Sequence, residues 1–422
     1  MRRPLLPTLV VPAVLVAACS SGSAPAGSAT VAPSSAPTPG SVSATASAST
    51  SASPSPTASP SPAAPLARLA YATANAVFVV TLNANGTPAA PAQQVSDTFP
   101  AGPGSGVSGL QWSRNGRFLV WSQLATGVEG IAWGLYDSGS GKHVTINGPS
   151  NGAAIATATD AGLLAMTDTR VTPYSTSGQP GLARTVHFNG KVVDLDGAAS
   201  GDEVLGNVAG AEPGGILLTV GDTDAHLVEV NAAGTGIDLG SVDAQQAALV
   251  NGGAGRDGYL ALEQGDHTDG CGVAPASVVL VVTPGRDATP IALPASPAGT
   301  LERAVNLEVS PDHVVGATLV ACGNGQGAGY ASDFAELHGT AWQVVANDAL
   351  AASRGPGGLL AYVHGRIGGE GEQYGPRGDQ HLRIETKTGT NAADLGGPVV
   401  AVLFAPAGPA PAPASPSSTP TA

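Results

Sequence analysis

The sequence predicts an all-β globular domain assembled from many short strands. The 422-residue chain contains 58 glycines and 35 prolines, residues that favour turns. Charged residues make up 11% of it, against roughly 25% in ordinary globular domains. Short apolar runs recur between glycine-rich turns, without the period of a ten-residue helix. Strands joined by turns are therefore expected to form the core.

The first eighteen residues have the pattern of an export signal. Arg2 and Arg3 carry positive charge, and the apolar stretch at residues 5–16 is too short to span a bilayer. The tetrad VAAC at residues 16–19 resembles the bacterial lipobox. The resemblance implies cleavage after residue 18 and lipidation of Cys19, including palmitate, which would anchor the protein at the outer face of the cell membrane. An ordinary secretory signal, which would release the protein, is the alternative.

Two low-complexity segments flank the globular part. Residues 20–65 consist almost wholly of Ser, Ala, Thr, Pro and Gly, and residues 406–422 are similar. Such segments bury too little apolar surface to offset the entropy of ordering. We therefore expect a disordered tether over residues 19–65, including the lipidated cysteine, one domain over residues 66–405, and a disordered tail. The net charge of −14 and the lack of a basic run argue against nucleic acid as a partner.

A hairpin unit repeats along the predicted domain. Its clearest copy is GLQWSRNGRFLVWS at residues 109–122, in which an Asn-Gly turn joins two short apolar strands. This copy resembles the hairpin of TolB-type and WD-type β-propeller blades. Similar hairpins begin near residues 153, 203, 247, 305 and 349, and a third and a fourth strand are expected to follow each of them.

The two ends of the domain complete one another in this interpretation. Residues 69–73 form a second-type strand without an inner partner, and residues 399–408 match the inner-strand pattern. The last strand is therefore expected to complete the first blade and close the ring. The fold class predicted is a seven-bladed β-propeller, with six blades as the alternative if the unit at residue 203 is not a blade.

Sequence motifs for catalysis were not found. Neither a hydrolase domain nor a G-x-S-x-G elbow follows residue 405, and the chain has no H-E-x-x-H motif and no phosphate-binding loop. Enzymatic activity is therefore not expected, and no catalytic or metal-binding residue is assigned. Two acidic clusters are candidates for calcium, but solvated turn acids are the simpler interpretation. The clusters are Asp194, Asp196 and Asp202, and Asp266, His267 and Asp269.

Three long connections are the predicted recognition surface. Residues 263–276, 321–330 and 364–379 are long and polar, and each joins the second and third strands of consecutive blades. Cys271 and Cys322 lie in two of these connections, and outside the cytoplasm they are expected to form a disulfide, with two free thiols as the alternative. The candidate partner-binding residues are His267, Asp269, Tyr330, Arg366, Glu370, Glu372, Tyr374 and Arg377.

Two functions remain open on the sequence alone. The first is a non-enzymatic scaffold lipoprotein that binds another envelope protein through these connections. The second is a small-ligand or metal-binding propeller, with or without enzymatic activity, that uses its central channel. Asn207, Asn251 and Asn306 are the only recurrent polar residues recognised in the predicted inner strands. The alanine- and glycine-rich, lysine-poor composition resembles that of proteins from high-GC actinobacteria.

Overall fold

The described part of the chain is built almost entirely of β-strands. The structure, a computed structural model, describes residues 67–99, 106–124, 131–149, 153–197, 200–221, 225–242, 250–264, 278–285, 288–294, 301–322, 332–367, 376–377 and 380–406. Within these ranges the one helical element is a single 3-10 turn, η1 (Pro356–Gly358). No helix in the same ranges is both long and apolar enough to cross a membrane. The all-β prediction is confirmed.

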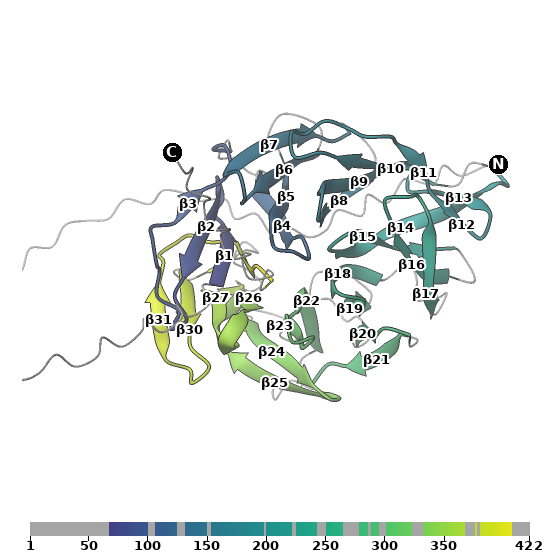
Figure 1. Cartoon of the computed structure of the whole chain (residues 1–422). Helices are drawn as coiled ribbons and strands as arrows, with labels where there is room; N and C mark the ends of the chain where they lie inside the picture. Colours follow the sequence, from purple (N-terminus) through teal and green to yellow (C-terminus); the bar gives the residue numbers. More distant parts are fainter. Residues whose placement is uncertain are drawn as a thin grey trace, which may run out of the picture. The chain divides into compact units, whose positions relative to one another are not determined.

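The described strands form seven four-stranded units, here called blades 1 to 7, arranged in a ring (Figure 1). From the inner strand outward, blade 1 contains β32 (Ala401–Phe404), β1 (Ala67–Ala72), β2 (Val77–Leu82) and β3 (Gln93–Gln94). Blade 2 contains β4 (Gly106–Trp112), β5 (Phe118–Leu124), β6 (Ile131–Asp137) and β7 (Lys142–Asn147). Blade 3 contains β8 (Ala154–Thr159), β9 (Gly162–Thr167), β10 (Arg170–Tyr174) and β11 (Arg184–Thr185).

The second half of the ring follows the same plan. Blade 4 contains β14 (Glu203–Glu212), β15 (Gly215–Val220), β16 (Ala225–Val230) and β17 (Gly236–Val242). Blade 5 contains β18 (Val250–Arg256), β19 (Tyr259–Gln264), β20 (Val278–Val282) and β21 (Thr289–Ala292). Blade 6 contains β22 (Leu301–Val309), β23 (Val315–Cys322), β24 (Ser332–His338) and β25 (Ala341–Ala346). Blade 7 contains β26 (Ala349–Arg354), β27 (Leu360–His364), β30 (Leu382–Glu385) and β31 (Asn391–Asp394).

Two short pairs of strands lie outside the blades. β12 (His187–Phe188) pairs with β13 (Lys191–Asp194), and β13 runs parallel to β14. β28 (Arg366–Ile367) pairs with β29 (Pro376–Arg377) in the connection between β27 and β30. The unit at residue 203 is a complete blade, because β14 to β17 pair in order.

The ring closes through the strand that the sequence assigned to this role. β32 pairs antiparallel with β1, and Leu69 lies opposite Phe404. Contacts between inner strands continue around the ring, from β32 with β4 to β26 with β32. The strand that completes blade 1 therefore comes from the other end of the domain.

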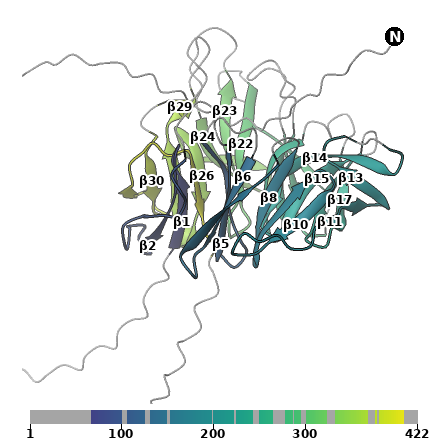
Figure 2. The ribbon, with the colours of Figure 1, turned by 90° about the horizontal axis from the view of Figure 1, so that it is seen from above.

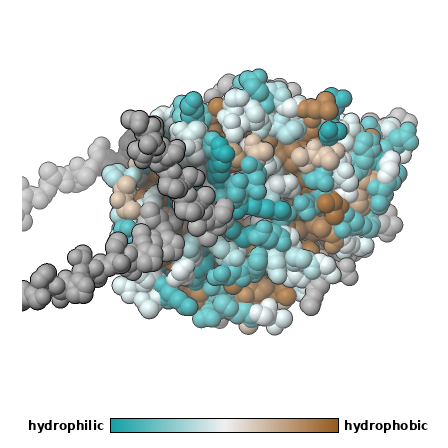
Figure 3. Space-filling view, viewed as in Figure 1, coloured by the Kyte–Doolittle hydropathy of each residue, from teal (hydrophilic) through white to brown (hydrophobic). Residues whose placement is uncertain are grey.

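Apolar side chains fill the spaces between blades. Each of the seven hydrophobic clusters combines residues of two neighbouring blades. Trp112, Trp121 and Trp133 are at most 2% exposed, as expected for residues that pack between adjacent sheets. Burial between blades therefore stabilises the ring and fixes the position of each inner strand. On the surface, polar and apolar residues mix on the face seen in Figure 3.

The antiparallel blades give the ring two different ends. The turns from first to second strands lie at one end, which we call the turn end, at residues 113–117, 160–161, 213–214, 257–258, 310–314 and 355–359. The connections from second to third strands lie at the other end, which we call the insertion end. Figure 2 shows β23 and β29 together at one edge of the molecule. The three long connections predicted from the sequence belong to the insertion end of blades 5, 6 and 7.

Candidate functional site

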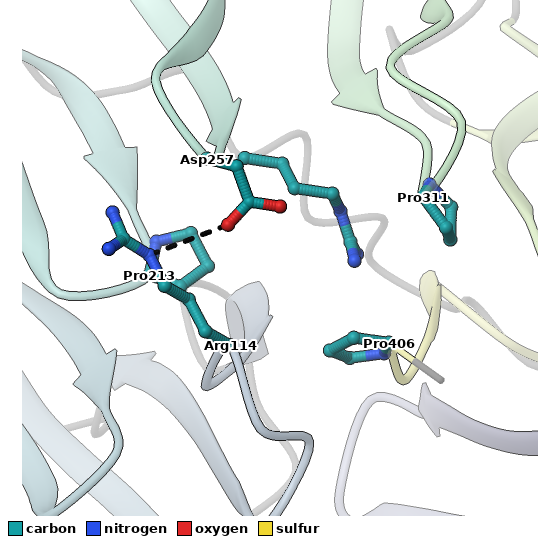
Figure 4. Close-up of a pocket in the computed structure, with 6 residues that line it drawn as sticks. Arg114, Pro213, Asp257, Pro311 and Pro406 are labelled. Carbon is teal, nitrogen blue, oxygen red and sulfur yellow. Dashed lines mark ion pairs between the residues drawn. The ribbon is translucent and has the colours of Figure 1, made fainter. Parts of the chain in front are cut away.

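A cavity of about 230 Å³ opens at the turn end (Figure 4). Its walls come from turns of blades 2, 4, 5 and 6 and from the residue that follows β32 by two positions. Because these turns all follow inner strands, the cavity lies where the central channel of the ring ends. The lining residues are Arg114, Pro213, Arg256, Asp257, Pro311 and Pro406.

Arg114 links three blades across the cavity. It lies in the turn between β4 and β5, and its Nη2 donates a hydrogen bond to Oε1 of Glu212, 3.0 Å away. Its Nε lies 3.7 Å from Oδ1 of Asp257 in the turn between β18 and β19, the ion pair dashed in Figure 4. The side chain of Arg114 is 47% exposed, whereas that of Glu212 is 1% exposed. The guanidinium of Arg114 therefore lies at the cavity surface and contacts the buried carboxyl group of Glu212 beneath that surface.

Glu212 ends the inner strand β14 in a low-dielectric environment. Burial and the nearby carboxyl of Glu229 raise the pKa of Glu212 to about 7, although the Gly258 amide and Arg114 oppose the shift. The Gly258 amide donates to Oε2 of Glu212 at 3.2 Å. At neutral pH this carboxyl is consequently divided between its neutral and charged forms.

Glu308 occupies a similar position near the end of β22. Its Oε1 accepts hydrogen bonds from the hydroxyl of Ser353 at 2.8 Å and from the amide of Arg354 at 2.9 Å. Burial raises the pKa of Glu308 to about 7, against the opposing effects of these donors and of Arg256. Blades 6 and 7 are thus joined by a buried carboxyl at the turn end.

Arg256 ends β18, and its Nε donates to the carbonyl of Val309 in blade 6 at 3.2 Å. Burial lowers the pKa of Arg256, and the charges of Glu308 and Asp257 partly oppose this shift. Among the described residues, no carboxylate lies within the 4.0 Å ion-pair distance of its guanidinium. Arg256 therefore brings to the cavity a cation without a direct acidic partner in this part of the chain.

The other charges around this end are engaged in links between strands and blades. Nε of Arg354 donates to Oε1 of Glu336 at 2.6 Å. Oδ2 of Asp257 lies 3.7 Å from Nε2 of His313, whose ring stacks on Tyr259 with the centroids 4.0 Å apart. These contacts hold the turns that form the cavity walls in fixed positions.

The arrangement suits binding of a small anionic group. Two guanidinium groups and one carboxylate line the cavity, and two further carboxyl groups of raised pKa lie around it. In the described ranges, no group of three or more His, Cys, Asp or Glu side chains is placed to hold a metal ion. Hydrogen-bonding cations inside a partly enclosed cavity recognise oxyanions.

Most of the predicted partner-binding residues lie outside the described residues, and so do Cys19 and Cys271. Of the others, Cys322 is the last residue of β23, opposite Leu301 of β22. Arg366 and Arg377 are cross-strand partners in the β28–β29 pair, which brings two distant positions of one connection together. The residues outside the described ranges are His267, Asp269, Tyr330, Glu370, Glu372 and Tyr374.

In the acidic cluster of Asp194, Asp196 and Asp202, the first two side chains accept hydrogen bonds from backbone amides. Oδ1 of Asp194 accepts from the amide of Asp196 at 2.9 Å, and Oδ1 of Asp196 accepts from the amide of Ala153 at 3.1 Å. A hydrogen bond with Asp196 and burial raise the pKa of Asp168. Asp266, His267 and Asp269 lie outside the described residues.

The charged ends of the inner strands were missed from the sequence. The expectation that Asn207, Asn251 and Asn306 were the recurrent polar residues was wrong, because Glu212, Arg256, Glu308 and Arg354 end or nearly end four successive inner strands. Each of the four precedes a turn that contains Gly or Pro by no more than three residues, and this repeated position is the signal that was available. Asn306 has a structural role: its Nδ2 donates to the Leu350 carbonyl of blade 7 at 2.7 Å.

Comparisons with known proteins find similarity at the level of the fold. No family model matches the chain, and no curated protein matches it. TolB from Acinetobacter baumannii is similar in structure, with a TM-score of 0.41, 13% sequence identity and coverage of 81% of this chain and 67% of that one. AztD from Citrobacter koseri gives a TM-score of 0.39 and 8% identity, over 81% of this chain and 98% of that one.

A third similar structure is the β-propeller domain of the Trilobed protease from Pyrococcus furiosus. Its TM-score is 0.41 at 8% identity, over 66% of this chain and 77% of that one. The strand order and ring closure described above establish the β-propeller class on their own, and these neighbours have the same class of fold.

Proposed function

We propose that this protein is a membrane-anchored, extracytoplasmic lipoprotein whose propeller is a non-enzymatic binding module for another envelope protein. Lipidated Cys19 is the anchor, residues 20–65 are the tether, and residues 66–405 are the binding domain. The insertion end of blades 5 to 7 is the proposed contact surface, held by a disulfide between Cys271 and Cys322. The lipobox-like tetrad at residues 16–19 supports the anchor.

One contact at the insertion end carries the proposal for the surface. The hydroxyl of Ser332, at the start of β24, donates to the carbonyl of Gly365, directly after β27, at 3.2 Å. Ser332 is fully buried, and the Gly365 amide donates to the carbonyl of Asp348 at 2.6 Å. The bases of the long connections in blades 6 and 7 are thus fastened to one another. A fixed base lowers the ordering cost when such connections bind a partner.

Crosslinking in cells tests the proposed contact surface. Wild type is compared with a variant shortened at residues 263–276 and 364–379, and captured peptides are identified by mass spectrometry. A control variant carries Arg184→Gln in the outer strand β11, away from the insertion end of blades 5 to 7. We expect a specific envelope partner with wild type and with the control, and none with the shortened variant. Equal capture by all three proteins, or no specific capture by wild type, overturns the proposal.

A separate measurement tests the anchor. Cys19→Ser should move the protein from the membrane fraction to the soluble fraction or the medium, because a cysteine thiol is the acceptor of the lipid. Ser20→Ala, which alters the adjacent residue and leaves the thiol intact, is the matched control. Retention of Cys19→Ser in the membrane fraction contradicts the lipoprotein assignment.

The cavity at the turn end supports a second function, binding of a small ligand at the end of the central channel. The observation that favours it is the presence of two arginines, Arg114 and Arg256, in the lining of one cavity. For the metal version of this function, thermal unfolding is compared with calcium and with EDTA. No shift in either direction excludes calcium as a ligand that stabilises the fold.

A further inference from the structure

The cavity at the turn end has features that define a chemical class of ligand. Its two cationic residues, Arg114 and Arg256, come from blades 2 and 5, and the one acidic residue in its lining is Asp257. The three remaining lining residues are prolines, from blades 4, 6 and the end of β32. Charged side chains and rigid apolar rings therefore line the same small space.

The positive charge of this cavity is only partly balanced. Arg114 pairs with Glu212 and, more distantly, with Asp257. Arg256 donates one hydrogen bond, from its Nε to a backbone carbonyl, which leaves its two terminal nitrogens without a partner among the described residues. A half-buried guanidinium with open donors can bind an acceptor from outside. A carboxylate matches the two parallel donors of a guanidinium.

The prolines decide between an inorganic anion and an organic one. Proline side chains offer no donor or acceptor, so they do not stabilise the outer oxygens of phosphate or sulfate. They do offer apolar surface for a short hydrocarbon chain. The volume of about 230 Å³ corresponds to roughly seven or eight water molecules at ~30 Å³ each, which is enough room for a small carboxylate.

We propose that the cavity at the turn end binds a short aliphatic carboxylate, with its carboxyl group on Arg256 and its hydrocarbon chain against Pro213, Pro311 and Pro406. A second carboxyl group, when the ligand has one, lies at Arg114. The site is independent of the proposed partner surface, because first-to-second turns and second-to-third connections lie at opposite ends of each blade. Failure of one proposal therefore leaves the other untouched.

Isothermal titration uses the full chain carrying Cys19→Ser, which lacks the thiol that would accept the lipid. The probes are butyrate and succinate, and acetate, inorganic phosphate and sodium chloride of matched ionic strength are the comparisons. We expect saturable binding of butyrate and succinate, weaker binding of acetate, and no binding of phosphate above the chloride control.

Variants assign the binding to the cavity. Arg256→Gln should lower the affinity for both probes at least tenfold, and Arg114→Gln should lower it for succinate more than for butyrate. Arg184→Gln, an exposed arginine in the outer strand β11, is the matched control and should bind as wild type does. Arg256→Lys keeps the charge and serves if Arg256→Gln does not fold, with an intermediate affinity expected because the planar pair of donors is lost.

Three results overturn the proposal. If neither carboxylate binds saturably at millimolar concentration, the protein has no such site. If both Arg256 variants bind with unchanged affinity, the carboxylate binds somewhere other than this cavity. Phosphate that binds as tightly as butyrate shows a general anion site, and contradicts the assignment to aliphatic carboxylates.

Discussion

Arg114 and Glu212 join two blades that are not neighbours. Arg114 belongs to blade 2 and Glu212 to blade 4, and Nη2 of the first lies 3.0 Å from Oε1 of the second, across the end of blade 3. The Asn115 amide adds a hydrogen bond to the Asp160 carboxylate of blade 3 at 3.0 Å. The turn between β4 and β5 thus fastens three consecutive blades at the end of the channel.

Removal of either partner should therefore cost stability, and the two losses should not add. Arg114→Ala is expected to lower the free energy of unfolding by about 1–2 kcal/mol at pH 8, because the buried Glu212 carboxylate loses its closest cation while solvent screens the half-exposed arginine. In the double variant with Glu212→Gln the loss should be smaller than the sum, as urea unfolding measures. Strict additivity would contradict a direct link, and Arg184→Ala is the surface control.

Phe404 should be essential for ring closure. The ring of Phe404 is 1% exposed in the cluster between blades 7 and 1, and its amide donates to the hydroxyl of Ser353 at 2.9 Å. We expect Phe404→Ala to lower the free energy of unfolding by about 3–5 kcal/mol, the range for deletion of a buried aromatic ring. Val400→Ala, at a residue 40% exposed next to the same strand, should cost under about 1 kcal/mol. Equal effects of the two changes would refute closure by β32.

Gly134 should not tolerate a side chain. It lies opposite Trp121 in the β5–β6 pair, and the Trp121 indole occupies the space that a β-carbon on Gly134 would need. Since Trp121 is 1% exposed and enclosed by its neighbours, we expect Gly134→Ala to cost about 1–3 kcal/mol through overpacking. Gly201→Ala meets nothing within 4 Å and should leave the melting temperature unchanged or slightly higher. Similar melting temperatures for both variants would contradict this packing.

Cys271 and Cys322 should be oxidised in exported protein. Thiol labelling of denatured protein, with and without a reductant, should reveal two extra thiols only after reduction. In the chain-entropy model, a disulfide that closes a loop of about fifty residues raises the free energy of unfolding by ~4 kcal/mol. Because Cys271→Ser and Cys322→Ser each remove the same bond, they should destabilise the protein equally. The double variant should be no less stable than either single one. Full labelling without reductant would contradict the disulfide and show that both cysteines are free thiols.

The fold could be predicted well because each hairpin is determined by residues that are close together in the sequence. The Asn-Gly turn at residues 115–116 and the apolar runs beside it are visible in the sequence, and β4 and β5 form there. Ring closure was also predictable, because residues 69–73 lacked an inner partner and residues 399–408 match the inner-strand pattern. The contact of Arg114 with Glu212 was not, since it joins residues 98 positions apart whose meeting depends on the curvature of the whole ring.

The cavity was harder to predict for a related reason. A charged residue before a turn is normally solvated, and only the convergence of several turns buries it. Glu308 shows this most clearly: the Pro-containing turn that follows it marks a strand end but does not indicate burial, yet the residue is 7% exposed because β18, β24 and β26 surround it. The long connections of the insertion end could be predicted, because their length and polar composition are visible in the sequence.

Glu308 should make the protein less stable as the pH rises from about 5 to 8. The groups that face its carboxyl are Ser353 and Arg354 of β26, Arg256 of β18 and Glu336 of β24. Burial raises its pKa in the folded protein to about 7, from an ordinary value of 4.5. Between these values the folded protein holds a proton that the unfolded chain releases, so the free energy of unfolding falls with rising pH and levels off above the folded pKa. The full effect of this group is at most about 3 kcal/mol.

Urea unfolding of wild type and of Glu308→Gln at pH 5, 6, 7 and 8 measures this contribution. The amide keeps an oxygen that accepts from Ser353 but does not ionise, so the variant should lose less stability than wild type over that range. Glu212→Gln should reduce the slope in the same direction, because its carboxyl also has a raised pKa. Asp312→Asn, at an exposed acid in the neighbouring turn, should leave the slope unchanged. Parallel curves for wild type and Glu308→Gln would mean that solvent or Arg256 keeps this carboxylate charged in the folded protein.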